Sequence, residues 1–191
     1  MSLTLLLFVA ACSSNQEVTR QEHDELSSHT SSARKNSGLS VPPAIRVEHE
    51  HLHHELEAAV ASGGTTAMRA REVAAILLPH FEEEEAYAMP PLGLLKSMAR
   101  KETLNEAQVE AAIGMAGRLR LEYGKMLKEH KEMTEALHQL AAAAKTEGKP
   151  EQSAFAESLI LHAQNEEQVL YPATLVIGDY LKLQRASRRA D

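Results

Sequence analysis

The chain has 191 residues, a formal net charge of −7, 43% hydrophobic residues and only 4% aromatic residues. This length fits one domain with a tail, and the negative charge argues against nucleic acid as a partner, because a phosphate backbone calls for a basic surface. The single cysteine, Cys12, excludes an intrachain disulfide, a Cys-based zinc site and an iron–sulfur cluster.

The first forty residues have the features of a targeting segment and a tether. Residues 3–11 form an apolar run, which is too short to span a bilayer as a helix. Residues 1–12 resemble the signal of a bacterial lipoprotein with a lipobox ending at Cys12, although positive charges before the apolar run are missing. Residues 13–41 are polar, and we predict a disordered linker there. We therefore expect a protein of the cell envelope, lipid-anchored through Cys12, with a cytoplasmic protein as the alternative.

Four long segments with helical periodicity follow, separated by proline or glycine. We predict helices at about 42–62, 65–89, 103–145 and 150–185. We also expect a kink at Pro79, a capping box formed by Thr103 and Glu106, and an interruption at Pro172. The connections are of modest length, which favours an all-α, antiparallel up-down four-helix bundle over residues 42–186, followed by a tail at 187–191.

One helix hairpin occurs twice in this region. Its first helix carries a histidine, which recurs at His49 and His130. Its second helix carries the string His-x-x-x-Glu, which recurs at His80 with Glu84 and at His162 with Glu166. The separation between the two copies is nearly identical for all of these residues. A single histidine on an apolar helix face is ordinary, but a duplicated set at matched offsets predicts a shared site.

The repeat predicts a metal site in the core. Residues four apart lie on the same helix face, about 6 Å apart along the axis. Two hairpins facing each other would bring four imidazoles and two carboxylates together, enough for two metal ions with two histidines each and bridging carboxylates. A nitrogen and oxygen donor set without thiolate favours iron, with manganese or zinc as alternatives. A cation would also compensate two glutamates whose burial alone is costly.

At these residues the chain resembles the hemerythrin-like, or HHE cation-binding, family over about residues 44–180. The motifs that carry the resemblance are Glu48-His49, His80-Phe81 with Glu84-Glu85, Glu129-His130, and His162 with Glu166-Glu167 leading into Leu170-Tyr171-Pro172. The resemblance implies a hemerythrin-like four-helix bundle that holds two non-haem iron ions with an oxo or hydroxo bridge. It implies four terminal histidine ligands and two bridging glutamate ligands, which are His49, His80, His130, His162, Glu84 and Glu166.

The chain departs from oxygen-carrying hemerythrins at one position. Those proteins place an additional histidine one turn before the third-helix ligand, and Met126 stands there in this chain. The resemblance therefore implies an open coordination position or a replacement ligand. In this respect the set is more similar to that of the iron–sulfur cluster repair di-iron proteins, which use four histidines and two glutamates. His53, one turn after His49, is either that ligand or a partly exposed helix residue. For Tyr87 and Tyr171, which lie near the motifs, we expect packing rather than donation to bridging groups.

The expected function is binding or sensing of O2, NO or peroxide at this di-iron centre, with an unknown redox partner. One alternative is a di-iron enzyme that reduces peroxide or NO, or an iron donor for iron–sulfur cluster repair. A further alternative is a bundle whose metal mainly stabilises the fold. Ferritin-like Glu-x-x-His strings also occur, but their spacing does not match the repeat, and they leave His80 and His162 without a role.

Overall fold

The computed structural model describes residues 38–190, and all regular structure in this range is helical. The prediction of an all-α protein is confirmed for this range. The elements are α2 (Pro43–Ala61), α3 (Gly64–Glu83), η1 (Glu84–Ala88), η2 (Pro90–Leu94), α4 (Leu95–Ala99), α5 (Glu106–Thr146), α6 (Pro150–Asn165), η3 (Glu166–Leu170) and α7 (Tyr171–Ala190). The predicted signal segment with Cys12, and the predicted linker as far as residue 37, lie outside the described residues.

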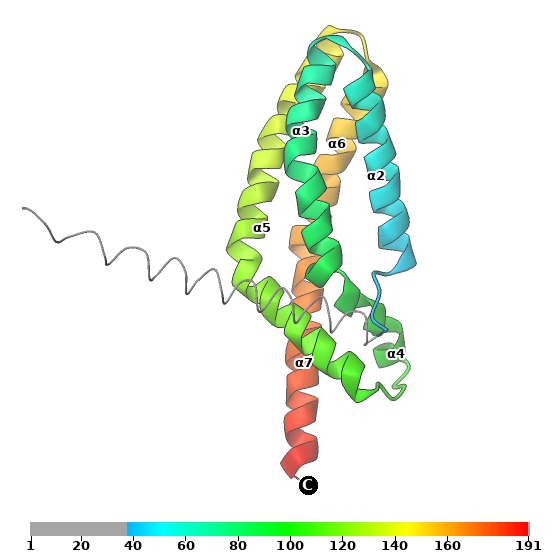
Figure 1. Ribbon diagram of the computed structural model, residues 1–191, viewed down its shortest axis with the longest axis vertical. Helices are drawn as coiled ribbons and strands as arrows, with labels where there is room; N and C mark the ends of the chain where they lie inside the picture. Colours follow the sequence, from blue (N-terminus) through cyan, green and yellow to red (C-terminus); the bar gives the residue numbers. More distant parts are fainter. Residues whose placement is uncertain (1–37, 191) are drawn as a thin grey trace, which may run out of the picture.

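Four helices pack side by side in two hairpins (Figure 1). The hairpin of α2 and α3 contacts the hairpin of α5 and α6 through α3 against α5 and through α2 against α6. Helix α7 continues the direction of α6 and packs along the first half of α5, while η2 and α4 form the connection from α3 to α5. Within residues 38–190, no helix is long and apolar enough to cross a membrane.

The interior contains two apolar clusters with polar side chains between them. Along α5, Met126 belongs to one cluster and Met133 to the other, and His130 lies between these two residues. The same order occurs on α2, where Ile45 and Leu52 flank a buried histidine. Burial of a large apolar side chain contributes about 1.5–3 kcal/mol, so both clusters stabilise the fold and shield the polar layer from water.

The repeat found in the sequence is also present in the backbone. Both His-x-x-x-Glu strings run directly into a π-helical turn, η1 at Glu84–Ala88 and η3 at Glu166–Leu170. These turns are closed by backbone hydrogen bonds from Met89 N–H to Glu84 O and from Tyr171 N–H to Glu166 O. A proline follows each glutamate by six residues, at positions 90 and 172, and proline has no N–H for the α-helical bond to the fourth preceding carbonyl. The wider turn is therefore located where each α-helical ladder loses a donor, and such turns are frequent at functional sites.

Of two predicted local details, one differs from the structure and one agrees with it. The capping box of α5 is formed by Asn105, whose side chain accepts from Gln108 N–H at 2.8 Å, and not by Thr103 and Glu106. The two strings overlap in the sequence, and the turn at Lys101, with its φ of 55°, brings the chain into the helix two residues later. The interruption expected at Pro172 is present, because the π-helical turn η3 separates α6 from α7. Pro172 itself lies in the first turn of α7, where proline is tolerated.

The folded region is longer than predicted at both ends. Leu39, which falls in the predicted linker, is buried in the core cluster around Tyr171. Helix α7 continues to Ala190, past the predicted end of the domain at residue 186. This long helix approaches α5 closely at Gly178, where a Cβ atom would lie 2.3 Å from the Cβ of Ala116. The last helix thus packs into the protein at least as far as Leu181, which is buried in the same core cluster.

Candidate metal centre

The six residues predicted from the repeat come together in the polar layer between the apolar clusters. None of the six is more than 5% exposed, and both glutamates are fully buried. They form two groups whose donor atoms lie within 4.8 Å of one another and which share Glu166. The first group is His80, Glu84, His130 and Glu166, and the second is His49, His162 and Glu166. These buried groups are able to hold a metal ion.

Each of the four histidines is oriented by a glutamate on a neighbouring element. We call these four glutamates the outer carboxylates. An ionised carboxylate only accepts hydrogen bonds, so the imidazole donates from Nδ1 and keeps the lone pair of Nε2 for the interior. The Nδ1–carboxylate distances are 3.2 Å for His49 and Glu85, 2.9 Å for His80 and Glu129, 3.1 Å for His130 and Glu167, and 3.0 Å for His162 and Glu48.

The outer carboxylates obey the same repeat as the six inner residues. Glu48 and Glu129 each stand directly before the histidine of a first helix, and Glu85 and Glu167 each stand directly after an inner glutamate. All four stand in the motifs on which the family resemblance is based, so the sequence already indicated these glutamates as candidates. It did not show which histidine each glutamate would contact, because every pair joins two different elements.

Each inner carboxylate faces both pairs of histidines. Glu84 Oε1 lies 3.5 Å from His80 Nε2, and Glu84 Oε2 lies 3.9 Å from His49 Nε2. Glu166 Oε2 lies 3.4 Å from His130 Nε2, and Glu166 Oε1 lies 3.0 Å from His162 Nε2. One oxygen of each glutamate is thus directed toward each of two positions, His80/His130 and His49/His162.

Several polar atoms at these positions are buried without a hydrogen-bond partner. They are His49 Nε2, His162 Nε2, Glu84 Oε2 and both carboxylate oxygens of Glu166. At the His80/His130 position, the two Nε2 atoms lie only 2.7 Å apart. Two lone pairs at this distance repel each other unless a cation or a proton lies between them. Buried polar atoms without partners are rare in proteins, and a cation at each position would satisfy these atoms.

The electrostatics of the centre also favour positive charge. Burial lowers the pKa of His80 and of His162, but the carboxylates around each ring outweigh burial and raise the pKa to about 9 for both. Burial and the charge of Glu166 raise the pKa of Glu84. Burial also acts to raise the pKa of Glu166, but the surrounding imidazoles outweigh it and hold that pKa well below its usual range. Without a metal ion, protons on the imidazoles supply the positive charge that the buried carboxylates require.

Tyr171, for which we expected a role in packing, lies among the inner residues. Its hydroxyl donates to Glu84 Oε1 at 2.5 Å and lies 3.3 Å from His80 Nε2 and 3.2 Å from His130 Nε2. In an α-helix, a residue five positions after Glu166 would point about 140° away from it at 3.6 residues per turn. The π-helical turn of η3 adds one residue to that turn, so Tyr171 returns to the face of Glu166. Regular helical periodicity therefore could not predict from the sequence that Tyr171 lies in the centre.

The alternative ligand His53 is not part of the centre. Its side chain is 47% exposed and pairs with Glu57 one turn further along α2. Met126, at the place of the additional histidine in oxygen carriers, is fully buried and accepts a contact from the Tyr87 hydroxyl at 3.3 Å. Neither residue therefore supplies a replacement nitrogen.

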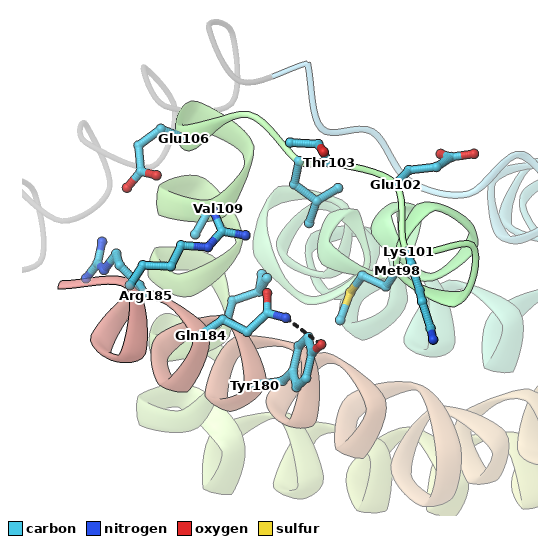
Figure 2. Close-up of a pocket in the computed structure, with 12 residues that line it drawn as sticks. Met98, Lys101, Glu102, Thr103, Glu106, Val109, Tyr180, Gln184 and Arg185 are labelled. Atoms are coloured by element: carbon cyan, nitrogen blue, oxygen red, sulfur yellow. Dashed lines mark hydrogen bonds between the residues drawn. The ribbon is translucent and has the colours of Figure 1, made fainter. Parts of the chain in front are cut away.

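Two surface depressions differ in their relation to the centre. One of about 340 Å³ lies between α2 and α3 over His49 and Phe81, and acidic side chains and His53 surround it. The other, also about 340 Å³, lies between α4, the start of α5 and the end of α7, where Gln184 donates a hydrogen bond to the Tyr180 hydroxyl (Figure 2). The second is lined by none of the six inner residues and does not belong to the metal centre.

Comparison of the chain with models of protein families, with characterised proteins and with solved structures gave no match.

Proposed function

We propose that this chain is a hemerythrin-like protein with an up-down four-helix bundle, holding two non-haem iron ions between its two hairpins. One ion would be held at the His80/His130 position and the other at the His49/His162 position. Glu84 would bridge them. Glu166 would also bridge the two positions.

The observation that carries this proposal is the orientation of the four imidazoles. Each ring is fixed by an outer carboxylate on Nδ1, and all four Nε2 atoms are directed into a buried layer with two carboxylates. Histidines that bind a metal usually donate their second N–H to a carboxylate or carbonyl in this manner. Four such pairs in a twofold repeat are far more than packing alone requires.

The function we propose is binding or sensing of O2, NO or peroxide. Iron held in this layer supplies a redox-active Lewis acid for small oxygen or nitrogen ligands. The protein would contribute the orientation of the imidazoles, the charge of the carboxylates, and the exclusion of water by the apolar clusters on both sides. Phe81 stacks on His49 with ring centroids 4.2 Å apart, and the depression between α2 and α3 lies over these two rings. A small apolar ligand would enter from this side.

Metal analysis of the full chain, purified after expression in iron-replete medium, tests the proposal. We expect two iron ions per chain and an oxo-to-iron charge-transfer absorption after oxidation. His80→Ala and His162→Ala remove one ligand from each position, and we expect each to lower the bound iron. His138→Ala is the matched control, because His138 is exposed on α5 and contributes nothing to the centre. Wild-type iron content in either ligand variant would refute the role of that residue.

The response of the loaded chain distinguishes the functions. Reversible bleaching of the charge-transfer absorption under argon would support binding or sensing. Repeated consumption of peroxide or NO would instead support the enzyme. Iron that does not respond to any of these ligands would support a structural role, in which metal binding to the folded state alone stabilises the protein.

A further inference from the structure

The Tyr171 hydroxyl lies among the donor atoms of only one of the two positions. It contacts Glu84 Oε1, His80 Nε2 and His130 Nε2 at 2.5, 3.3 and 3.2 Å. The side chain is fully buried, and its ring stacks on that of His130, with centroids 5.5 Å apart and planes 18° apart. The ring stacking and the three contacts fix the position of the phenol oxygen.

These distances are those of neighbouring donors around one metal ion. Donors at right angles around an ion with bonds of about 2.1 Å lie about 3 Å from one another. His80 Nε2 and His130 Nε2 are 2.7 Å apart, and the Tyr171 oxygen is 3.3 and 3.2 Å from them. The three atoms therefore form a triangle with the dimensions of one face of a coordination polyhedron.

We propose that Tyr171 is a seventh protein ligand, which binds the metal at the His80/His130 position through its phenol oxygen. This inference rests on the proposed metal centre. The metal–oxygen bond replaces the O–H bond, and the hydroxyl proton is released to solvent, since anionic ligands bind metals after losing their protons. The phenolate joins the carboxylates as an anionic oxygen donor, a ligand type suited to hard cations.

The ligand makes the two metal positions chemically different. In the repeat, Met89 is the equivalent of Tyr171, because these two residues follow Glu84 and Glu166 at the same distance along the chain. Met89 has no phenol oxygen and lies buried in an apolar cluster. At the His49/His162 position, the aromatic ring that stacks on a histidine is Phe81, which has no donor atom. Tyr171 thus fills coordination space at one metal, and the open position for an external ligand falls on the other.

Optical and resonance Raman spectra of the iron-loaded full chain test this inference. In the oxidised wild type we expect a visible phenolate-to-iron charge-transfer band and enhanced tyrosinate ring vibrations. Tyr171→Phe should keep its iron but lose the band and these vibrations completely. Tyr87→Phe is the matched control, because Tyr87 is equally buried but its hydroxyl contacts Glu83 and Met126, and it should keep both signals.

A measurement on the wild type covers the case in which Tyr171→Phe does not fold. Protein grown with ring-deuterated tyrosine should shift the enhanced vibrations. Bound iron without any tyrosinate signal, or an unchanged spectrum in Tyr171→Phe at equal iron content, would overturn the inference and leave the metal centre standing. A wild type that binds no metal would overturn both.

Discussion

The two proposed metal positions contain the same kinds of donor but are bounded by different aromatic residues. Each has two histidines and two outer carboxylates related by the doubled hairpin, and one oxygen of each glutamate is directed toward it. At one position Tyr171 stacks on His130, and at the other Phe81 stacks on His49. The residues that the repeat would pair with these rings are Met89 and Ala163.

The shared donors bear on whether a metal binds, whereas the differing aromatic residues bear on the reactivity of a bound metal. The duplicated residues provide the same kinds of donor at both positions. The two residues that break the repeat place a phenol oxygen at one position and an apolar ring at the other. If the repeat sets the chemistry of both positions, matched substitutions in the two copies should have equal effects.

The largest expected effect is a loss of stability of the chelated, metal-free chain at alkaline pH. The pKa values of His80 and His162, one from each position, are raised to about 9, above the value of about 6.5 in an unfolded chain. The folded state thus retains protons that the unfolded state releases, so the stabilisation is complete below pH 6.5 and is lost as the pH rises through about 9. One pKa unit corresponds to about 1.4 kcal/mol, so we expect a decrease on the order of a few kcal/mol in urea unfolding.

The variants His80→Gln and His162→Gln should each flatten this pH profile to a similar extent. A steep profile that only one of them flattens would show that the two positions are electrostatically unequal. Metal affinity should change in the opposite sense and rise with pH, because metal binding displaces the same protons.

An intermediate effect is expected for the outer carboxylates. Glu129→Gln at one position and Glu48→Gln at the other remove the charge that orients His80 and His162. Loss of such a partner typically lowers metal affinity by about 10-fold to 100-fold, which competition with a chelator of known affinity would measure. The control is Glu132→Gln, since Glu132 is exposed and pairs only with Lys128 along α5. Wild-type affinity in both test variants would contradict the role of the outer carboxylates.

The smallest effect is expected for His53→Ala. This histidine lies one turn from His49, but it is exposed and pairs with Glu57. Surface substitutions of this kind usually change stability by less than about 0.5 kcal/mol, and we expect unchanged iron content. A loss of one iron per chain would restore His53 as a ligand and would break the equality of the two positions.

Regular features of the chain were predictable because they depend on local spacing. Pro43 and Pro150 mark the starts of α2 and α6 as expected, and Gly148, with its φ of 68°, follows the end of α5. The capping box was misplaced by two residues because two overlapping strings satisfy the same rule. The path of the chain after α4 places Asn105 at the N-cap of α5, and no local sequence rule specifies this path.

The sequence by itself determined that the protein is helical and that four histidines and two glutamates recur in a doubled hairpin, because helical periodicity and repeat offsets are properties of the linear chain. The tertiary structure alone decided which outer carboxylate contacts which histidine, since each pair joins elements that meet only on packing. It also decided the place of Tyr171, because two π-helical turns shift the register beyond Glu84 and Glu166 and direct a side chain that a regular helix would turn away.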